Sequence, residues 1–325
     1  MLSPHRLAAL FATSFAATTL VFSLASPSTA PAMSAGPLAP APEWLPPAWV
    51  AQPDAMALTA MDGHGQGRGP LVHSHAAFVF DLDQERVLFE RRADNRRPVA
   101  SLTKVVASLA YASLQPDLDH PACIDFEQRP SRSGARSRLN TGDCATGWDY
   151  LGAALVASDN RAAYALAAAA EVSVDELVTQ MNQVSDELGM RSSRWADPSG
   201  LEDENLSTAR DISRAMVALA SVPELALAAS APSWDLHRDA QATRRLFTTN
   251  KLSGSDRVLV EAAKTGYTDT AGYCLSTLVQ TSTGQRLVIT VLGAPNDRTR
   301  WADVARVVEW AERHDGADDA LADAN

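Results

Sequence analysis

The sequence predicts a two-lobed α/β protein with a cleft between its lobes. Apolar runs of strand length occur in two places, near the start and near the end of the patterned part of the chain. The long segment between them has mostly helical periodicity and polar loops. Two early strands, three late strands, flanking helices and a helical insert are therefore expected, with the functional site in the cleft.

The early elements are predicted to be a hairpin and a helix. Residues 76–82 and 86–91 are apolar runs on either side of the polar Asp83-Gln84-Glu85, which is the pattern of two strands and a turn. From residue 101 to residue 114 the apolar positions recur at helical spacing. Ser101 is therefore expected at the start of a helix.

The middle of the chain contains two Ala-rich stretches, residues 149–157 and 161–170. Between them stands Ser158-Asp159-Asn160, which we expect to connect two buried helices. We expect this connection to be extended, so that Ser158 and Asn160 alternate along it and both can face the cleft.

The late elements are three strands and a helix. Residues 259–266, 272–281 and 286–293 have the composition and length of strands. A closing helix follows, and its apolar face is formed by Trp301, Val304, Val307, Val308 and Ala311.

The two ends of the chain lie outside this pattern. Residues 1–32 have a basic start, a mostly apolar run and small residues, which predicts an export signal. An uncleaved membrane anchor is the alternative, but hydroxyl side chains dilute the apolar run, so we expect cleavage, no permanent anchor, and a periplasmic or envelope-associated protein. Residues 33–75 are expected to form a disordered linker, 76–312 the folded domain, and 313–325 an acidic disordered tail.

Composition excludes some classes of function. Of the 325 residues 46% are hydrophobic, enough for a sizeable core, and the net charge is −11. A nucleic-acid partner is not expected, because no basic stripe is present. His64, His73 and His75 could bind a metal, but no cluster of cysteines or carboxylates stands nearby, so no metal is expected.

Three cysteines leave two pairing states open. Cys123 and Cys144 flank a polar stretch and could form a disulfide in an exported protein, or both could remain thiols. Cys274 lies in an apolar strand pattern and is expected to be a buried free thiol.

Only three of the 28 basic residues are lysines, and two of these stand in short motifs. Lys104 follows Ser101 by three residues, so both side chains lie on one face of the predicted helix. An amine in a dry pocket at the positive end of a helix loses its proton readily, whereas a guanidinium stays charged. Lys104 could therefore take the proton of a Ser101 nucleophile.

The other two motifs offer complementary chemistry. Ser158 can relay a proton, and Asn160 can hold the substrate backbone or orient the lysine amine. On the late strand, Lys264 supplies positive potential, Thr265 a hydroxyl, and Gly266 room for a substrate backbone. Singly, the motifs can be explained as a helix cap, a loop turn and a strand end. Their joint occurrence, order and spacing indicate one site.

The triple S-x-x-K, S-x-N and K-T-G is similar to that of penicillin-binding proteins and class A β-lactamases. The wider resemblance, over about residues 76–310, is to the low-molecular-mass D-alanyl-D-alanine peptidases. It rests on Pro98-Val99-Ala100-Ser101-Leu102-Thr103-Lys104, Met181-Asn182, Leu188-Gly189-Met190, Gly200-Leu201, Ser207-Thr208-Ala209-Arg210-Asp211, Thr249-Asn250, Lys264-Thr265-Gly266-Tyr267-Thr268 and Ala271-Gly272-Tyr273-Cys274-Leu275.

This resemblance implies a fold and an activity. The fold is a five-stranded antiparallel sheet flanked by helices, with a mainly helical subdomain and the active site in the cleft between them. The activity is hydrolysis of D-alanyl bonds in peptidoglycan stem peptides through an acyl-enzyme, without metal or organic cofactor. β-Lactams are expected to be covalent inhibitors.

It also implies roles for single residues. The backbone N–H groups of Ser101 and Tyr267 are expected to form the oxyanion hole. Arg300 falls where related carboxypeptidases hold the terminal carboxylate of the substrate, and the alternative is a solvated arginine at a helix start. The remaining implied site residues are Ser101 as nucleophile, Lys104 as its base, Ser158, Asn160, Lys264, Thr265 and Gly266.

Two features favour the endopeptidase branch, that of penicillin-binding protein 7. These are Ser137-Arg138-Leu139 together with residues 158–163, and an end soon after the closing helix without a further β domain. Asp159 departs from the Gly or Glu usual in these peptidases and is typical of class A β-lactamases. A β-lactamase is therefore one alternative, although Glu202 and Glu204 lie in a peptidase-like pattern. A non-catalytic penicillin-binding regulator is the other.

Overall fold

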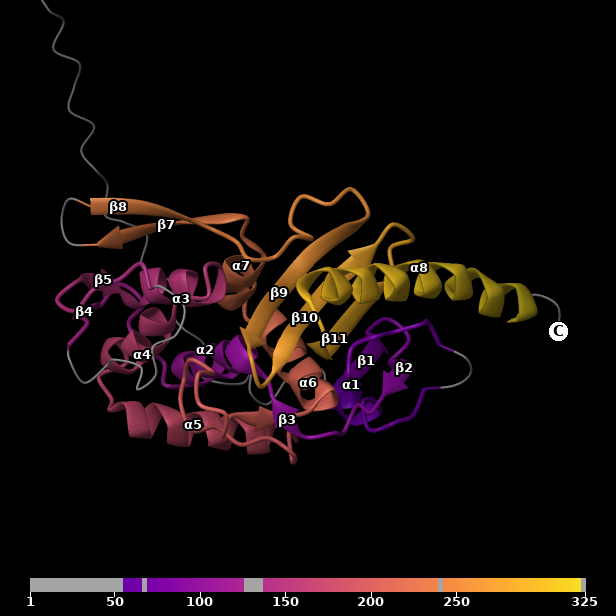
Figure 1. The fold of residues 1–325 in the computed structure, drawn as a ribbon, viewed down its shortest axis with the longest axis horizontal. Coiled ribbons are helices and arrows are strands. Elements are labelled where there is room, and N and C mark those ends of the chain that lie inside the picture. The colour runs from indigo at the N-terminus through magenta and orange to yellow at the C-terminus, as the bar shows by residue number, and fades with distance from the viewer. Residues whose placement is uncertain (1–54, 66–68, 126–136, 239–241, 323–325) are drawn as a thin grey trace, which may run out of the picture. The chain divides into compact units, whose positions relative to one another are not determined.

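A five-stranded antiparallel sheet, in the order β2-β1-β11-β10-β9, forms the centre of the structure (Figure 1). The structure is a computed structural model that describes residues 55–65, 69–125, 137–238 and 242–322. The predicted sheet is confirmed, and β2 and β10 have the predicted bounds. Its strands are β1 (Ala76–Asp81), β2 (Arg86–Arg91), β9 (Val258–Thr268), β10 (Gly272–Thr281) and β11 (Arg286–Ala294).

The sheet is covered on both faces, which explains why β1 is buried along its whole length. On one face, α8 (Asp297–Ala322) packs Val304 and Val307 against Val79 and Ile289. On the other face lies α6 (Ala209–Ala220), with α2 (Thr103–Ser113) packed against α6, and Phe78 belongs to the larger core cluster on this side. Alternate residues of one strand thus enter two separate cores.

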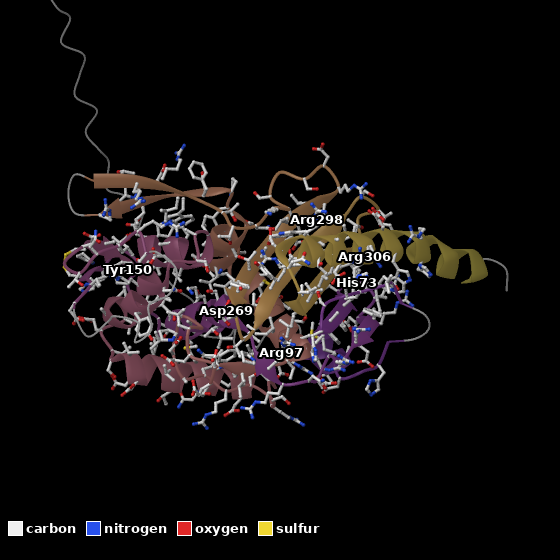
Figure 2. All side chains as sticks on the ribbon, in the orientation of Figure 1. His73, Arg97, Tyr150, Asp269, Arg298 and Arg306 are labelled. Atoms are coloured by element: carbon white, nitrogen blue, oxygen red, sulfur yellow. A yellow bond between two sulfur atoms is a disulfide. The ribbon has the colours of Figure 1, made fainter. Side chains whose placement is uncertain are left out.

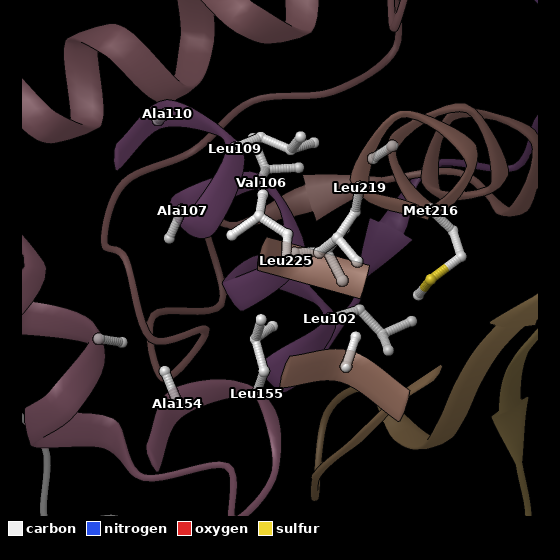
Figure 3. Close-up of a cluster of buried hydrophobic side chains, with 14 of the residues drawn as sticks. Leu102, Val106, Ala107, Leu109, Ala110, Ala154, Leu155, Met216, Leu219 and Leu225 are labelled. Atoms are coloured by element: carbon white, nitrogen blue, oxygen red, sulfur yellow. The ribbon is translucent and has the colours of Figure 1, made fainter. Parts of the chain in front are cut away.

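The helical lobe is held by apolar contacts among α2, α3, α6 and α7. Leu102, Leu155, Met216 and Leu225 belong to its cluster of buried apolar side chains (Figure 3). Full burial of one such side chain contributes about 2 kcal/mol. The remaining helices are α1 (Ala55–Ala60), α3 (Gly147–Leu155), α4 (Asn160–Ala169), α5 (Val174–Glu187) and α7 (Pro223–Ser230).

Three small two-stranded sheets in the middle of the chain were not predicted. They pair β3 (Arg97–Pro98) with β6 (Leu206–Ser207), β4 (Pro121–Cys123) with β5 (Cys144–Thr146), and β7 (Ser233–Arg238) with β8 (Ala242–Phe247). These strands are short or polar, so tertiary packing stabilises them. For example, the rings of Trp234 and Trp148 are 4.8 Å apart.

A disulfide joins Cys123 to Cys144, which are direct partners in the β4–β5 pair. This decides between the two states that the sequence left open. Closing a loop of this length contributes about 3 kcal/mol in the chain-entropy estimate. Cys274 is a buried free thiol, as predicted.

The predicted domain boundaries need correction at both ends. Residues expected in a disordered linker are ordered, because α6 and α8 bind them: Arg214 donates to Leu58 O at 2.6 Å, and Ser74 Oγ donates to Asp303 at 2.6 Å. In Figure 2, His73 lies beside Arg306, whose guanidinium is 3.0 Å from the His73 ring. At the other end α8 runs to Ala322, since the tail is rich in alanine, a strong helix former.

The predicted signal, residues 1–32, lies outside the described residues. Within the described part of the chain, no single helix has both the length and the apolar character that a membrane span requires. The bent pair of α6 and α7 meets that test jointly, by length and composition alone.

Candidate active site

Ser101 and Lys104 stand where a short 3₁₀ turn, η1 (Ala100–Leu102), becomes α2. A helical side chain leans toward the preceding turn, so the lysine returns to the serine. Lys104 Nζ lies 2.9 Å from Ser101 Oγ. Neither η1 nor α2 has a side-chain cap, so the explanation of Ser101 as a helix cap is wrong.

The Lys104 side chain is completely buried and has three oxygen neighbours. Besides the serine, these are Asn160 Oδ1 at 2.8 Å and the Ser199 carbonyl at 2.6 Å, both of which can only accept hydrogen bonds. A neutral amine has two N–H donors and one lone pair. It can donate to these two acceptors while its lone pair accepts the hydroxyl proton of Ser101.

The charge state of Lys104 agrees with this arrangement. Burial lowers the pKa of Lys104 to about 7, although the negative charges of Asp197 and Asp159 raise it. A large share of the molecules therefore carries a neutral amine near pH 7. An arginine at this place would stay charged.

The S-x-N segment is a turn between α3 and α4, and the expectation of an extended segment is wrong. Ser158 has a φ of 57°, in the left-handed region, and Asn160 is the first residue of α4. Only four residues separate the end of α3 from the start of α4, and the left-handed backbone of Ser158 allows the chain to change direction within them. As a result, Ser158 Oγ lies 2.8 Å from Lys264 Nζ, whereas Asn160 contacts Lys104.

The unusual middle residue of this motif, Asp159, has a local structural task. Its carboxylate caps α4 by accepting from the backbone N–H of Arg161 at 3.0 Å. It also accepts from Ser137 Oγ and from the Arg138 backbone N–H, each at 2.6 Å. Asp159 is almost fully buried, so it fixes the motif from behind.

Lys264 is buried in β9 on the opposite wall of the site. Its Nζ donates to Thr265 O at 2.9 Å as well as to Ser158 Oγ. Burial lowers the pKa of Lys264 well below its usual value, and the positive charges of Lys104 and Arg300 lower it further. The Thr265 hydroxyl lies 2.6 Å from the Thr249 hydroxyl.

Gly200 and Gly266 allow the Ser199 loop and β9 to approach the backbone of η1 beside Ser101. A Cβ atom on Gly266 would lie 3.1 Å from Ser101 N, so the backbone of β9 runs directly beside that N–H. A Cβ atom on Gly200 would lie 2.0 Å from the Ala100 carbonyl oxygen, and Gly200 has a φ of 85°. Ala100 itself has a φ of 50°, an uncommon backbone state for alanine.

The loop that supplies Ser199 and Gly200 was missed as part of the site. The Asp197 carboxylate holds it by accepting from Ser199 N and Gly200 N at 2.6 Å and from Glu202 N at 2.9 Å. The signal was present in Asp197-Pro198-Ser199-Gly200, a typical turn sequence. Nothing in that sequence shows that the turn reaches Lys104.

Arg300 lies in the first turn of α8, and its side chain is 8% exposed. It donates to Cys274 O at 2.9 Å and to Gly266 O at 3.2 Å, and it forms an ion pair with Asp297. Burial lowers its pKa. The alternative of a solvated arginine is therefore wrong, and Arg300 holds the ends of β9 and β10 together.

These groups surround a cleft of about 380 Å³. Lys104 and Lys264 lie beneath its surface, and the Tyr267 side chain is half exposed at its edge. Within the described part of the chain, no acidic residue lines it. The lining residues are Ser101, Arg138, Ala157, Ser158, Asn160, Gly200, Leu201, Thr249, Thr265, Gly266, Tyr267, Thr268, Tyr273 and Arg300.

Comparison with known proteins places this site in a family. The family of peptidase S11, described as D-alanyl-D-alanine carboxypeptidase, matches residues 65–296. A D-alanyl-D-alanine endopeptidase from Pseudomonas aeruginosa is 32% identical over 241 residues, 74% of this chain and 77% of that protein. A D-alanyl-D-alanine endopeptidase from Escherichia coli is 29% identical over 245 residues, 75% of this chain and 78% of that protein.

Solved structures agree. A D-alanyl-D-alanine carboxypeptidase from Mycobacterium tuberculosis has a TM-score of 0.69 and 25% identity, covering 77% of this chain and 94% of that one. Penicillin-binding protein D2 from Listeria monocytogenes, in its cefotaxime-bound form, has a TM-score of 0.65 and 25% identity, covering 75% of this chain and 98% of that one. The predicted fold and family are confirmed: the chain belongs to the S11 family of serine D-alanyl-D-alanine peptidases.

Proposed function

We propose that the protein is an exported DD-peptidase that hydrolyses D-alanyl bonds of peptidoglycan stem peptides through an acyl-enzyme on Ser101. One observation carries the proposal. The Lys104 amine has two neighbours that can only accept hydrogen bonds and one hydroxyl neighbour, Ser101, at 2.9 Å. This set matches a neutral base poised on a nucleophile.

Acylation follows from this geometry. Ser101 Oγ attacks the carbonyl carbon of the D-alanyl residue, and its proton moves to Lys104 Nζ. The negative charge on the carbonyl oxygen is stabilised by the N–H groups of Ser101 and Tyr267, on the adjoining backbones of η1 and β9. The proton that Lys104 took from Ser101 returns to the leaving amine as the C–N bond breaks, and the Ser158 hydroxyl, which lies 2.8 Å from Lys264 Nζ, is the proposed relay to the substrate.

Substrate binding uses the other wall. Lys264 and Thr265 face the carboxylate next to the leaving amine, and Gly266 lets the substrate backbone lie along β9. Asn160 orients Lys104 through its 2.8 Å contact. Arg300 acts by fixing the strand ends and adding positive charge. A water molecule then hydrolyses the acyl-enzyme, and Lys104 accepts its proton.

Endopeptidase action on cross-links is the preferred activity, with carboxypeptidase action as the second. The two relatives described above are endopeptidases, and Ser137-Arg138-Leu139 packs directly on the S-x-N turn. Export is supported by the disulfide between Cys123 and Cys144, because such bonds persist outside the cytoplasm.

β-Lactams are expected to acylate Ser101, and the resulting acyl-enzyme is expected to hydrolyse slowly. A class A β-lactamase needs a carboxylate that activates the deacylating water, and among the described residues no carboxylate lines the cleft. This observation supports a peptidase over the β-lactamase alternative.

The test uses mature protein, purified cross-linked stem-peptide dimers and monomeric pentapeptides, with products identified by mass. Release of monomers from the dimers supports the endopeptidase, and loss of one D-alanine supports the carboxypeptidase. The Ser101→Ala variant should do neither. If the wild-type protein cleaves neither substrate, the proposed activity is wrong.

A further inference from the structure

Arg138 lines the cleft on the side formed by η1, α4 and the S-x-N turn, which we call the helical wall. It stands on a segment whose backbone is held by several hydrogen bonds. The Asp159 carboxylate accepts from Ser137 Oγ with one oxygen and from the Arg138 backbone N–H with the other. On the far side, the Arg161 guanidinium donates to the Leu139 carbonyl. The Arg138 backbone is therefore held in place beside the S-x-N turn.

The Arg138 guanidinium is less constrained than its backbone. Its Nη1 donates to Ala157 O at 3.2 Å, and the side chain is half-buried. Among the described residues, no carboxylate forms an ion pair with it, because Asp159 contacts only its backbone N–H. The other arginine of the cleft, Arg300, already holds two carbonyls and the carboxylate of Asp297.

The charge of the cleft defines the ligand that suits Arg138. The protein as a whole has a net charge of −11, yet two arginines and, in the described chain, no acidic residue line this cleft. A narrow positive site in an acidic protein attracts anions. A guanidinium with unoccupied donors binds a planar carboxylate best, since two parallel N–H groups match its two oxygens.

We propose that Arg138 binds a carboxylate of the stem peptide away from the scissile bond and so selects acidic stems over amidated ones. This inference rests on the proposed function. Besides the C-terminal carboxylate, a stem peptide can carry a free carboxylate on its second residue and another on its third. Either group has the required chemistry, and either can be converted to an amide without changing the scissile bond.

The experiment compares three synthetic stem pentapeptides: one with both internal carboxylates free, one amidated at the second residue, and one amidated at the third. Wild-type protein should show a KM about 10- to 100-fold lower for the peptides that keep the recognised carboxylate, with little change in kcat. Arg138→Gln should raise KM to the amidated level and remove the preference. Arg138→Lys should restore part of it, because the charge returns without the planar fork.

Arg257→Gln is the matched control, because Arg257 is exposed and pairs with Glu309 outside the cleft. If Arg138→Gln no longer raises KM once one of the two carboxylates is amidated, that carboxylate is the group that Arg138 binds. Equal losses on all three peptides would show a structural role for Arg138, and unchanged KM values would show no role, and either result overturns the inference.

A binding measurement separates this inference from the proposed activity. Calorimetric titration of Ser101→Ala with the same peptides needs no turnover, and it should show the same preference, lost in the Ser101→Ala, Arg138→Gln double variant. If wild-type protein hydrolyses neither these pentapeptides nor the cross-linked dimers, but the single variant still prefers the free acid, the proposed activity fails and the role of Arg138 stands. If hydrolysis occurs without any binding preference, the role of Arg138 fails alone.

Discussion

Each wall of the cleft buries one lysine amine, but the two walls hold it in different ways. On the helical wall, Lys104 Nζ contacts η1, α4 and the loop at Ser199, three segments far apart in the chain. On the sheet wall, Lys264 Nζ contacts the S-x-N turn and the backbone of its own strand. The position of the first amine therefore depends on three irregular junctions, whereas that of the second depends mainly on strand register.

The difference implies different chemical tasks for the two lysines. In the proposed mechanism Lys104 exchanges a proton, and Lys264 supplies positive potential. Lys104→Arg should therefore reduce the rate of Ser101 acylation by labelled penicillin about 1,000-fold or more, because a guanidinium cannot act as the base at pH 7. The rate is measured by following covalent label in the intact protein by mass.

Lys251→Arg is the control for that change, because Lys251 is the remaining lysine and is mostly exposed. Far-ultraviolet circular dichroism and thermal melting show whether Lys104→Arg still folds. If the folded Lys104→Arg variant acylates at the wild-type rate, Lys104 is not the base, and the proposed difference between the two lysines is wrong.

The sheet wall was the easier one to predict from the sequence. Strands such as 272–281 were predicted with the observed bounds, because a strand buried in a regular sheet needs an apolar pattern, and that pattern is visible in the local sequence. The K-T-G motif lies in a strand of this kind. The position of its backbone there depends only on local sequence and strand register.

The helical wall was predicted in its residues but not in its geometry. The S-x-x-K spacing correctly placed Lys104 beside Ser101, since one helical turn joins them. The left-handed φ of Ser158 and the contact of Ser199 with Lys104 were not predicted. Both depend on how segments that are distant in the sequence pack together. The local conformational propensity of a serine carries no information about that packing.

Gly200 tests the junction that brings the Ser199 loop to the helical wall. Gly200→Ala should lower the free energy of unfolding by about 3 kcal/mol, because the new Cβ atom would lie 2.0 Å from the Ala100 oxygen in a left-handed backbone. Gly254→Ala should cost only about 1 kcal/mol, since Gly254 has a similar φ, 76°, with no atom near its missing Cβ.

Chemical denaturation measures both variants, and penicillin acylation adds a functional readout. The Gly200 variant should also acylate more slowly, because displacement of this loop moves the Ser199 carbonyl away from Lys104. Equal destabilisation by the two substitutions would mean that the backbone conformation matters and the close approach to Ala100 does not.

Lys264→Arg sharpens the contrast between the two amines. Burial lowers the pKa of Lys264, but the negative charge of a bound substrate carboxylate favours its protonated form. Arginine is charged in either state, so acylation should fall only about 10- to 100-fold, from the poorer fit of a larger group in a fully buried place. The loss should be greater for peptides with a C-terminal carboxylate than for an amidated analogue. A loss as large as that of Lys104→Arg would mean that Lys264 also transfers a proton, through its 2.8 Å contact with Ser158.

The pH profile gives the smallest and most specific effect. In the proposed mechanism acylation requires neutral Lys104, whose pKa burial lowers to about 7. Below that pH the neutral fraction falls about tenfold per unit, so the rate should rise with pH and level off above about 7. Stopped-flow or quenched labelling between pH 5 and about pH 9 measures this limb.

Asp159→Asn should move the limb toward lower pH, because the negative charge of Asp159 raises the pKa of Lys104. Asparagine retains an acceptor for the cap of α4, so the turn should survive. Asp256→Asn, which removes an equal charge from an exposed place, should leave the limb where it is. A limb that moves equally in both variants would report net charge alone, and one that moves in neither would mean that another group titrates. A shift in Asp159→Asn alone would connect the titrating base to the helical wall.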